Sequence, residues 1–369
     1  MAKIIVKKSN PLKGKVKIDG AKNAVLPIIA ATLLVKGKSV LHEVPDLTDV
    51  HVISDLIRHL GAEVEYKDNT LTVDASNLTT CEAPYELVRK MRASFFVMGP
   101  LLARFNQTKI SMPGGCSIGT RPIDLHLKGF KALGADIIMD HGFVEAKADK
   151  LVGSKLYLDF PSVGATENIM MAAVLAEGTT IIENAAEEPE IVDLQLFLNK
   201  AGGNICGAGT NRIYIEGVKK LDWCEHTIIP DRIETGTFMT MAVATGGELF
   251  IESTEPKHLS ATIDIVKKTG AVIKINKNSL YIDAPEKINA IEKIATNVYP
   301  KLPTDMQAEI MAMVLKAKGK SYISENIFNG RNKHIPEMNK MGANITQIDS
   351  RHFEVNGVDN LVGTEVEAT

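Results

Sequence analysis

A helix end, a glycine and a strand start follow one another in Lys268-Thr269-Gly270-Ala271-Val272-Ile273-Lys274-Ile275. Glycine just past a periodic helix is a stop signal, because the chain turns through the left-handed backbone region there. The alternating apolar residues that follow are typical of a strand with one buried face. This stretch therefore predicts a helix, a tight turn and a strand.

The same pattern occurs five times along the chain. The four other helix ends are His59-Leu60-Gly61-Ala62, Ala132-Leu133-Gly134-Ala135, Lys200-Ala201-Gly202-Gly203 and Lys340-Met341-Gly342-Ala343. The five glycines are separated by 73, 68, 68 and 72 residues. A nearly constant period predicts stacked repeats, each with two helices and the strands that follow them. The fold class is therefore expected to be α/β.

Charged residues recur where the first helix of a repeat begins. These helices are expected at Asn23–Leu34, Arg92–Leu102, Thr166–Ala176, Glu234–Ala244 and Asp305–Lys316. Lys22, Arg92 and Arg232 each lie 15 residues before the turn that ends the helix. Cations beside the unpaired N–H groups of a helix start favour anion binding, although solvated helix ends are the alternative. We favour a shared ligand site. Asp305, at the fifth position, is either a helix cap or a proton acceptor.

Bulk composition excludes several classes of protein. A chain of 369 residues is too long to form one compact core, so two domains are expected. A formal net charge of −3 gives no basis for nucleic-acid or anionic-membrane binding. The four cysteines are widely spaced, which argues against a disulfide framework or a metal site. We expect a cytoplasmic protein with no cofactor and no bound metal.

Cys116 lies in the glycine-rich run Pro113-Gly114-Gly115-Cys116-Ser117-Ile118-Gly119, shortly before Arg121. Nearby positive charge and partial exposure favour the reactive thiolate. A buried, inert cysteine is the alternative. The loop is the candidate site of nucleophilic or proton-transfer chemistry.

Seven stretches combine such residues in a fixed order. They are Gly20-Ala21-Lys22-Asn23-Ala24, Met91-Arg92-Ala93-Ser94, Pro113-Gly114-Gly115-Cys116, Arg121-Pro122-Ile123-Asp124-Leu125-His126, Ser162-Val163-Gly164-Ala165-Thr166, Pro230-Asp231-Arg232-Ile233-Glu234-Thr235-Gly236 and Pro303-Thr304-Asp305-Met306-Gln307, followed by Asn329-Gly330-Arg331. Taken together, from about Lys3 to Thr369, they closely resemble the enolpyruvyl transferase family.

The resemblance implies a two-domain, inside-out α/β barrel built from repeats, with the active site in the cleft between the domains. The first domain is expected at residues 21–229, with three repeats and the Cys116 loop. Residues 1–20 and 230–369 are expected to form the second domain. The family pattern has a sixth repeat after Thr369, so we expect this second domain, with two repeats, to be incomplete.

The resemblance also implies a reaction. The enolpyruvyl group of phosphoenolpyruvate is transferred to the 3-hydroxyl of UDP-N-acetylglucosamine, and phosphate is released. This is the first committed step of peptidoglycan synthesis, and hence part of cell-wall growth, cell shape and division. The implied partners are these two small molecules, with no nucleic acid and no membrane.

Residue roles follow from the same resemblance. Cys116 is expected to protonate phosphoenolpyruvate, and fosfomycin-type epoxides alkylate the matching thiol. Asp305 is expected near the reacting hydroxyl, and Lys22 is a further catalytic candidate. The implied substrate contacts are Lys22, Asn23, Arg92, Arg121, Pro122, Ile123, Asp124, Leu125, Ser162, Val163, Gly164, Arg232, Asp305, Ile327 and Arg331.

Two other functions stay open at this stage. A non-catalytic UDP-sugar-binding remnant is possible, because a phosphoenolpyruvate contact of the family lies in the sixth repeat. The sister enzyme that acts on shikimate 3-phosphate shares the fold, but the cysteine loop and the 121–126 motif favour the UDP-sugar reaction.

Overall fold

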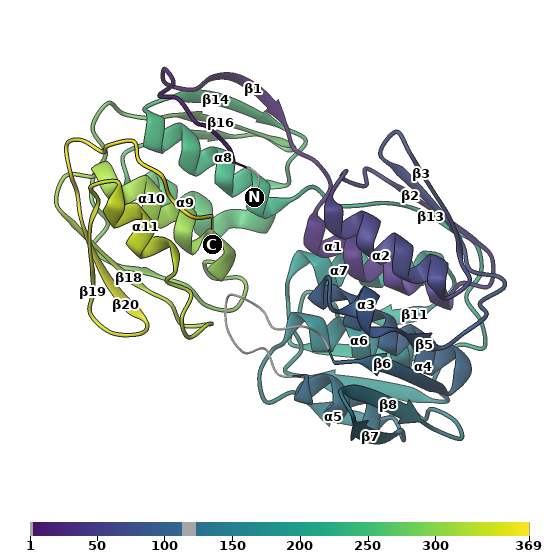
Figure 1. The fold of residues 1–369 in the computed structure, drawn as a ribbon. Helices are drawn as coiled ribbons and strands as arrows, with labels where there is room; N and C mark the ends of the chain where they lie inside the picture. Colours follow the sequence, from purple (N-terminus) through teal and green to yellow (C-terminus); the bar gives the residue numbers. More distant parts are fainter. Residues whose placement is uncertain (1–2, 113–122, 369) are drawn as a thin grey trace. The chain divides into compact units, whose positions relative to one another are not determined.

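The chain passes twice between two separately packed units in the computed structural model, which describes residues 3–112 and 123–368. The crossings lie between Ile18 and Asp19 and between Ile229 and Pro230. We call residues 19–112 with 123–229 the large unit, and residues 3–18 with 230–368 the small unit. Each unit has a hydrophobic core of its own, and Figure 1 labels many of the helices and strands.

The large unit contains three four-stranded sheets in its described residues. Its strands are β2 (Lys38–His42), β3 (Glu63–Lys67), β4 (Thr70–Asp74), β5 (Glu82–Ala83), β6 (Gln107–Ser111), β7 (Asp136–Asp140), β8 (Phe143–Lys147), β9 (Lys155–Tyr157), β10 (Thr179–Glu183), β11 (Asn204–Cys206), β12 (Arg212–Glu216) and β13 (Cys224–Thr227). Its helices are α1 (Lys22–Ala31), α2 (Thr48–His59), α3 (Tyr85–Val88), α4 (Met98–Phe105), α5 (Asp124–Ala132), α6 (Val163–Ala173) and α7 (Pro189–Lys200), with 3-10 segments η1 (Thr32–Leu34) and η2 (Arg92–Val97).

The small unit contains two four-stranded sheets in the part that the structure describes. Its strands are β1 (Lys13–Lys17), β14 (Glu248–Glu252), β15 (Val272–Ile275), β16 (Ser279–Asp283), β17 (Ile294–Ala295), β18 (Lys320–Ser324), β19 (Asn344–Gln347) and β20 (His352–Asn356). Its helices are α8 (Arg232–Thr245), α9 (Ser260–Lys268), α10 (Gln307–Met313) and α11 (His334–Lys340), with 3-10 segments η3 (Pro256–Leu259), η4 (Thr304–Met306) and η5 (Val314–Lys316).

All five sheets have the same internal order. A parallel edge strand pairs with the strand that follows the repeat's first helix, and two antiparallel strands complete the sheet. In three sheets the edge strand comes before that helix in the chain, with α3 between them in the case of β5. The exceptions are β1, which pairs with β14, and β13, which pairs with β2. The strand before α1, the first helix of the large unit, therefore belongs to a sheet of the small unit. The strand before α8, the first helix of the small unit, belongs to a sheet of the large unit.

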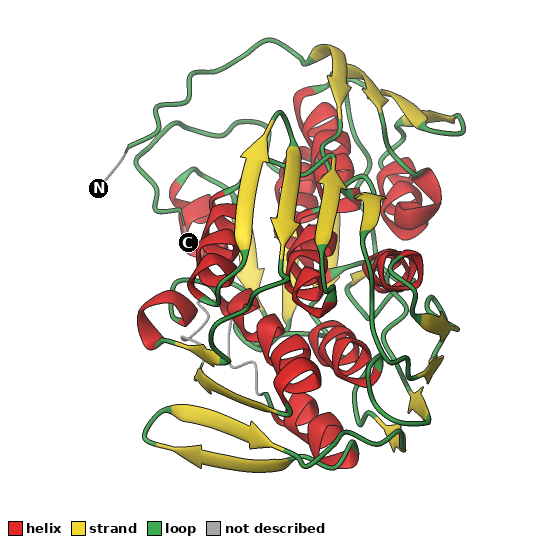
Figure 2. Ribbon diagram, turned by 90° about the vertical axis from the view of Figure 1, so that its right-hand side faces the viewer, coloured by secondary structure: helices red, strands yellow, loops and turns green. Residues whose placement is uncertain are grey.

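The first helices of the repeats form the cores of the units. In α1, eight of ten residues are buried, and in α6 nine of eleven are buried. A helix that is apolar on every side must be covered on every side. Strands such as β4 and β12 alternate buried with more exposed residues, as expected for sheets with one face on this core. Figure 2 shows a sheet seen face on, with helices behind it.

The helix bounds differ from the sequence prediction in the third and fourth repeats. Helix α6 begins at Val163 rather than Thr166, because the hydroxyl of Ser162 caps it by accepting the N–H of Ala165 at 3.4 Å. Helix α8 begins at Arg232 rather than Glu234. The carboxylate of Asp231 caps it by accepting two backbone N–H groups.

The second and fifth of the predicted first helices start as 3-10 turns, η2 and η4, before α4 and α10. Pro100 lies in the first turn of α4, where its missing N–H removes no internal helix bond. A continuous α-helix through Arg92 would have placed this proline in the interior. The predicted helical segment exists, but its first turn has a tighter geometry.

The five glycine turns are confirmed. The backbone φ angles of the five residues are all between +89° and +104°. A Cβ is disfavoured in this left-handed region, so glycine is the natural residue at each position. The positions are Gly61, Gly134, Gly202, Gly270 and Gly342.

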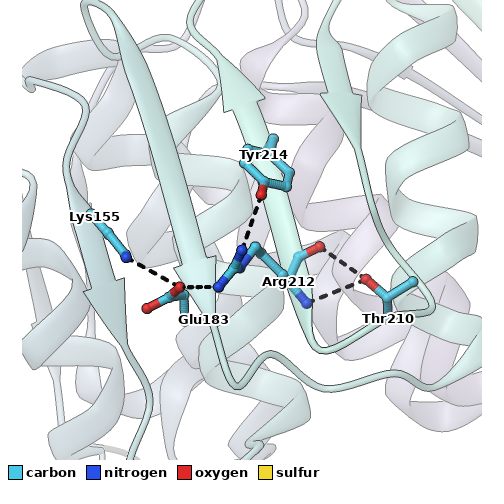
Figure 3. Close-up of polar contacts among 5 residues, drawn as sticks. All are labelled: Lys155, Glu183, Thr210, Arg212 and Tyr214. Carbon is cyan, nitrogen blue, oxygen red and sulfur yellow. Dashed lines mark hydrogen bonds and ion pairs between the residues drawn. The ribbon is translucent and has the colours of Figure 1, made fainter.

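The exposed side of one sheet in the large unit carries a polar ladder. Glu183 Oε1 on β10 lies 3.2 Å from Lys155 Nζ on β9 and 2.5 Å from Arg212 Nη2 on β12 (Figure 3). Arg212 Nη1 donates to the hydroxyl of Tyr214 at 3.4 Å. Such cross-strand pairs add modestly to sheet stability and keep this face polar. Across the ranges 3–112 and 123–368, no helix is long and apolar enough to cross a membrane.

Gly357→Ala should destabilise the small unit. A Cβ at Gly357 would overlap the carbonyl oxygen of Ala317, which backbone geometry holds in place, whereas Gly363 has open space around it. We expect Gly357→Ala to lower the free energy of unfolding by about 1–3 kcal/mol, and Gly363→Ala to leave it nearly unchanged. Chemical denaturation monitored by circular dichroism measures both. Equal stability of the two variants would contradict the close packing.

Glu167→Gln should change how stability depends on pH. Glu167 is fully buried in α6, and burial together with Glu190 and Glu188 raises its pKa well above the ordinary value. At a pH between the unfolded and the folded pKa, the folded state therefore keeps this proton and the unfolded state has lost it. The free energy of unfolding of the unmodified protein accordingly falls as pH rises above the unfolded pKa. Glutamine has no proton to lose.

The melting temperature of Glu167→Gln, relative to the unmodified protein, should accordingly rise between pH 5 and pH 8. Glu63→Gln, at an exposed position on β3, is the control and should show no such trend. A pH-independent difference for Glu167→Gln would mean that the carboxyl is already ionised in the folded state.

Candidate active site

Helix α1 presents two of the predicted site residues at its first two positions. Lys22 and Asn23 are exposed, whereas the rest of the helix is buried. Ala21 precedes them as the N-cap residue and makes no side-chain cap hydrogen bond. Lys22 Nζ lies 2.5 Å from Asp49 Oδ2 in the first turn of α2. This helix start is suited to an anion.

Arg92 begins η2 in the second repeat, as the sequence analysis predicted for a charged helix start. Its charge acts on His126, a buried histidine of α5 that the sequence analysis did not single out. Burial first, and then Arg92, lowers the pKa of His126 to about 3. The imidazole is therefore neutral at physiological pH, and Arg92 supplies the positive charge of this group.

The start of α6 lies beside the same histidine. Ser162 is its N-cap, and Val163 and Gly164 are its first two residues. A Cβ at Gly164 would lie 3.5 Å from His126 Nε2 and 3.5 Å from the ring of Phe96. The structure thus brings Arg92, His126 and the predicted contacts of α6 together.

Helix α5 carries three more predicted contacts. Ile123 is its buried N-cap residue, Asp124 is exposed at the first position and Leu125 follows. The next residue is His126, so the run Ile123–His126 reaches from the surface to the buried ring. Asn168 of α6 contacts that ring at Nδ1, at 3.1 Å, and so joins α5 to α6.

In the small unit, Asp305 and Arg331 form an ion pair. Arg331 Nη1 donates to Asp305 Oδ1 at 3.0 Å and to the hydroxyl of Thr304, also at 3.0 Å. The side chain of Arg331 is 17% exposed and that of Asp305 is 37% exposed. Two predicted site residues, 26 positions apart, therefore lie side by side.

Glu325 connects this pair to Ile327. Thr304 Oγ1 donates to Glu325 Oε2 at 2.9 Å. The other oxygen, Oε1, accepts the backbone N–H groups of Ile327 at 2.8 Å and Phe328 at 3.0 Å. The carboxylate is buried, and its hydrogen bonds fix the predicted contact Ile327 next to the ion pair.

Two further titratable groups, His334 and Glu309, lie near Arg331. Burial and Arg331 lower the pKa of His334 to about 4, so this ring is neutral. Burial raises the pKa of Glu309, and the nearby Asp305 adds to that effect against the opposing charge of Arg331. Perturbed groups that gather around one arginine are typical of functional sites, although structural networks also produce them.

Arg232 is the third of the predicted cations at helix starts. It begins α8, as expected, but it belongs to the small unit, whereas Lys22 and Arg92 belong to the large unit. Its guanidinium carbon lies 5.6 Å from the centre of the Tyr299 ring, in a cation–π contact. A ligand site shared by the three cations stays a prediction. The predicted residues Cys116, Arg121 and Pro122 lie outside the described residues.

The sequence analysis missed four residues that hold the predicted ones in position. They are His126, Asn168, Thr304 and Glu325. Two had a sequence signal, since His126 ends the 121–126 motif and Thr304 precedes Asp305 at a helix start. The contacts of Asn168, and that of Glu325 with Thr304, join residues 21 to 73 positions apart, so no local pattern predicts them.

The two groups of residues suit complementary chemistry. Lys22, Arg92 and the start of α6 can bind phosphate or carboxylate oxygens through charge and backbone N–H groups. In the small unit, the Asp305 carboxylate can accept a proton while Arg331 orients it. Within the described ranges, no three ligating side chains are placed to hold a metal ion.

Known proteins similar to this chain were found by sequence and by structure. A family model described as EPSP synthase (3-phosphoshikimate 1-carboxyvinyltransferase) matches residues 6–369. UDP-N-acetylglucosamine 1-carboxyvinyltransferase 1 of Caldanaerobacter subterraneus subsp. tengcongensis is 56% identical over 367 residues, which cover 100% of this chain and 88% of the relative. UDP-N-acetylglucosamine 1-carboxyvinyltransferase 2 of Carboxydothermus hydrogenoformans is 53% identical over 371 residues, with the same coverage.

Solved structures agree at the level of the fold. The enolpyruvyl transferase NikO from Streptomyces tendae superposes with a TM-score of 0.84 at 22% identity, over 94% of this chain and 82% of that one. An EPSP synthase from Acinetobacter baumannii superposes with a TM-score of 0.68 at 17% identity, over 95% and 83%. Given the family match over nearly all its residues and relatives more than half identical to it, this chain belongs to the EPSP synthase family of enolpyruvyl transferases.

Proposed function

We propose that this protein transfers the enolpyruvyl group of phosphoenolpyruvate to the 3-hydroxyl of UDP-N-acetylglucosamine, with release of phosphate. The observation that carries the proposal is the 56% identity, along the whole chain, to a relative named as a UDP-N-acetylglucosamine 1-carboxyvinyltransferase. The reaction is a committed step of peptidoglycan synthesis. It places the protein in the cytoplasm, in cell-wall growth and division, and makes Cys116 a target of fosfomycin-type epoxides.

The large unit supplies contacts for anionic groups. Lys22 and Asn23, together with Arg121, bind the phosphate and carboxylate of phosphoenolpyruvate. Arg92 and residues 121–125 bind the UDP-sugar, as do the N-cap Ser162 and the two residues after it. The exposed positions of Lys22 and Asn23 at the start of α1 support this division.

The small unit supplies the proton acceptor. Asp305 takes the proton of the sugar 3-hydroxyl while the hydroxyl oxygen forms a bond to carbon 2 of phosphoenolpyruvate. Cys116 gives a proton to carbon 3 of phosphoenolpyruvate. Loss of phosphate and of one proton from carbon 3 then restores the double bond. The ion pair with Arg331 supports this role, because it orients the Asp305 carboxylate. Arg331 also contacts phosphoenolpyruvate. Ile327 contacts the UDP-sugar, and Arg232 contributes to the shared substrate site.

The proposed architecture is an inside-out α/β barrel in each of two domains, at 21–229 and at 1–20 with 230–369. The common strand order of the sheets and the buried first helices support it. The family pattern has six repeats, and the described part of this chain contains five, three in the large unit and two in the small unit.

A UDP-sugar-binding protein without turnover is the second candidate, because several of the proposed UDP-sugar contacts on α5 and α6 lie together around His126. The sister reaction on shikimate 3-phosphate is disfavoured, since both relatives reported above, each more than 50% identical to this chain, are named for UDP-N-acetylglucosamine.

Mixing the protein with both substrates should release phosphate, and Cys116→Ala should abolish the release at neutral pH. The variant removes the proton donor to carbon 3 but leaves the UDP-sugar contacts, so it should still bind UDP-N-acetylglucosamine. Cys206→Ala, at an exposed position on β11, is the control and should turn over normally. A coupled phosphate assay and calorimetry measure the two properties. Binding without turnover in the unmodified protein would support the second candidate, and no binding would overturn both.

Asp305→Asn should lower turnover about 100-fold or more, because the amide cannot accept the hydroxyl proton. Stability should change by less than about 1 kcal/mol, since the ion pair with Arg331 is partly exposed. Asp264→Asn, at an exposed position on α9, is the matched control. Steady-state kinetics and thermal melts separate the effects. Unchanged turnover in Asp305→Asn would remove this residue from the proton transfer.

A further inference from the structure

Asn168 is a fully buried residue of α6 whose side chain contacts three other segments. Its Oδ1 accepts the backbone N–H of Gly99 at 2.7 Å. Its Nδ2 lies 3.0 Å from the carbonyl oxygen of Phe95 and 3.1 Å from His126 Nδ1. Oxygen and nitrogen of an amide are assigned from their partners, and here the partners leave one choice.

The backbone contacts fix the orientation of this amide. Gly99 offers an N–H donor and Phe95 offers a carbonyl acceptor, so Oδ1 faces the former and the NH2 group faces the latter. The second hydrogen of that NH2 group points at His126 Nδ1. Nδ1 must therefore accept a hydrogen bond, which places the single proton of the neutral ring on Nε2.

A second proton cannot be added without breaking this arrangement. It would have to sit on Nδ1, facing the N–H of Asn168. Burial and the charge of Arg92 on η2 oppose the same protonation, and the pKa of His126 is lowered to about 3. The ring also lies beside Phe95, and Phe96 and Gly164 are close to it; none of these residues titrates. The ring is thus a neutral donor through Nε2 over the whole physiological range.

The Nε2 edge of the ring faces the start of α6. A Cβ at Gly164 would lie 3.4 Å from Cε1 and 3.5 Å from Nε2, so the glycine leaves room for a ligand atom to approach the N–H. Ser162 and Val163 precede this glycine, and their helix start favours anions. Within residues 3–112 and 123–368, Asn168 is the ring's only hydrogen-bond partner, and it uses Nδ1.

We propose that Asn168 is a positioning residue that holds His126 as a neutral Nε2–H donor to a diphosphate oxygen of the UDP-sugar. The proposal rests on the proposed function, which supplies that ligand. Arg92 contributes charge, and His126 contributes a directional hydrogen bond that does not change with pH. The opposite tautomer would turn a lone pair toward the same oxygen and repel it.

Asn168→Asp tests the positioning role. One carboxylate oxygen still accepts from Gly99, but the other now faces His126 Nδ1 and draws a proton onto it. The ring then titrates near or above its ordinary pKa, and when neutral it presents a lone pair at Nε2. We expect the Kd for UDP-N-acetylglucosamine to rise about 10-fold or more between pH 6 and pH 8.5, whereas that of the unmodified protein changes less than about 2-fold.

Asn199→Asp is the matched control. Asn199 of α7 makes the same kind of amide contacts, accepting from the N–H of Ile205 at 2.9 Å and donating to its carbonyl at 2.8 Å, but it contacts no histidine. The substitution should cost stability without giving the Kd a pH dependence. Equal pH behaviour of Asn168→Asp and Asn199→Asp would overturn the positioning role.

Two variants of the ring test the donor itself. Glutamine places its amide N–H near the position of Nε2, whereas asparagine reaches only that of Nδ1. His126→Gln should keep the affinity for UDP-N-acetylglucosamine within about 3-fold, and His126→Asn should lose about 10–100-fold. Equal affinities of the two variants for UDP-N-acetylglucosamine would overturn the donor role. The two histidine variants also keep the proposal testable if Asn168→Asp fails to fold.

The tautomer can be read without any ligand. Nitrogen-15 shifts of labelled histidine should show His126 protonated at Nε2 alone from pH 5 to pH 8. A ring that titrates near pH 6.5, or that carries its proton on Nδ1, would overturn the inference whatever the protein binds. If instead the unmodified protein does not bind UDP-N-acetylglucosamine, the proposed function fails while the nitrogen shifts still decide the tautomer.

Discussion

The first helices of the three repeats in the large unit, α1, α4 and α6, are buried along most of their length, and the location of the chemistry there depends on that. In α1 the residues that are not buried are the first two, Lys22 and Asn23. In α6 they are again the first two, Val163 and Gly164. A buried helix cannot carry charge along its length without a large desolvation cost. In α1 and α6, the positions that are not buried, where a charged group avoids this cost, are therefore at the helix starts.

The polar residues that do occur inside these helices have specialised surroundings. Asn168 satisfies its amide completely and sets the protonation of a neighbouring ring. Glu167, one position earlier, has no hydrogen-bond partner for either carboxyl oxygen among the described residues, and burial raises its pKa and so favours the neutral form. The same buried turn thus contains one side chain that is fully satisfied and one that is not. A buried polar group without a hydrogen bond lowers the free energy of unfolding, so Glu167 reduces the stability of the folded state.

Local features of the fold could be predicted from the sequence. The five glycines mark left-handed turns because the conformation depends on the residue itself. The charged helix starts at Lys22, Arg92 and Arg232 follow from the repeat period. The start of α6 was misplaced because Ser162, a good N-cap, lies in a run of small residues that could also be a loop. Strand pairing was beyond reach, since β1 and β13 are both short and either could join β2 or β14 by pattern. The contacts of Asn168 and Glu325 depend in the same way on the assembled fold.

The exchange of β1 and β13 bears on how the chain folds as it is synthesised. β1 emerges from the ribosome roughly 230 residues before β14, the strand it finally joins. The edge of β2 is available much earlier, and it is the edge that a preceding strand occupies in three of the other sheets. Until β13 emerges, β1 and the open edge of β2 are together on the nascent chain. Unpaired strand edges invite non-native pairing during folding. The order of translation therefore favours a pairing that the finished protein does not use, and β13 must displace or outcompete it.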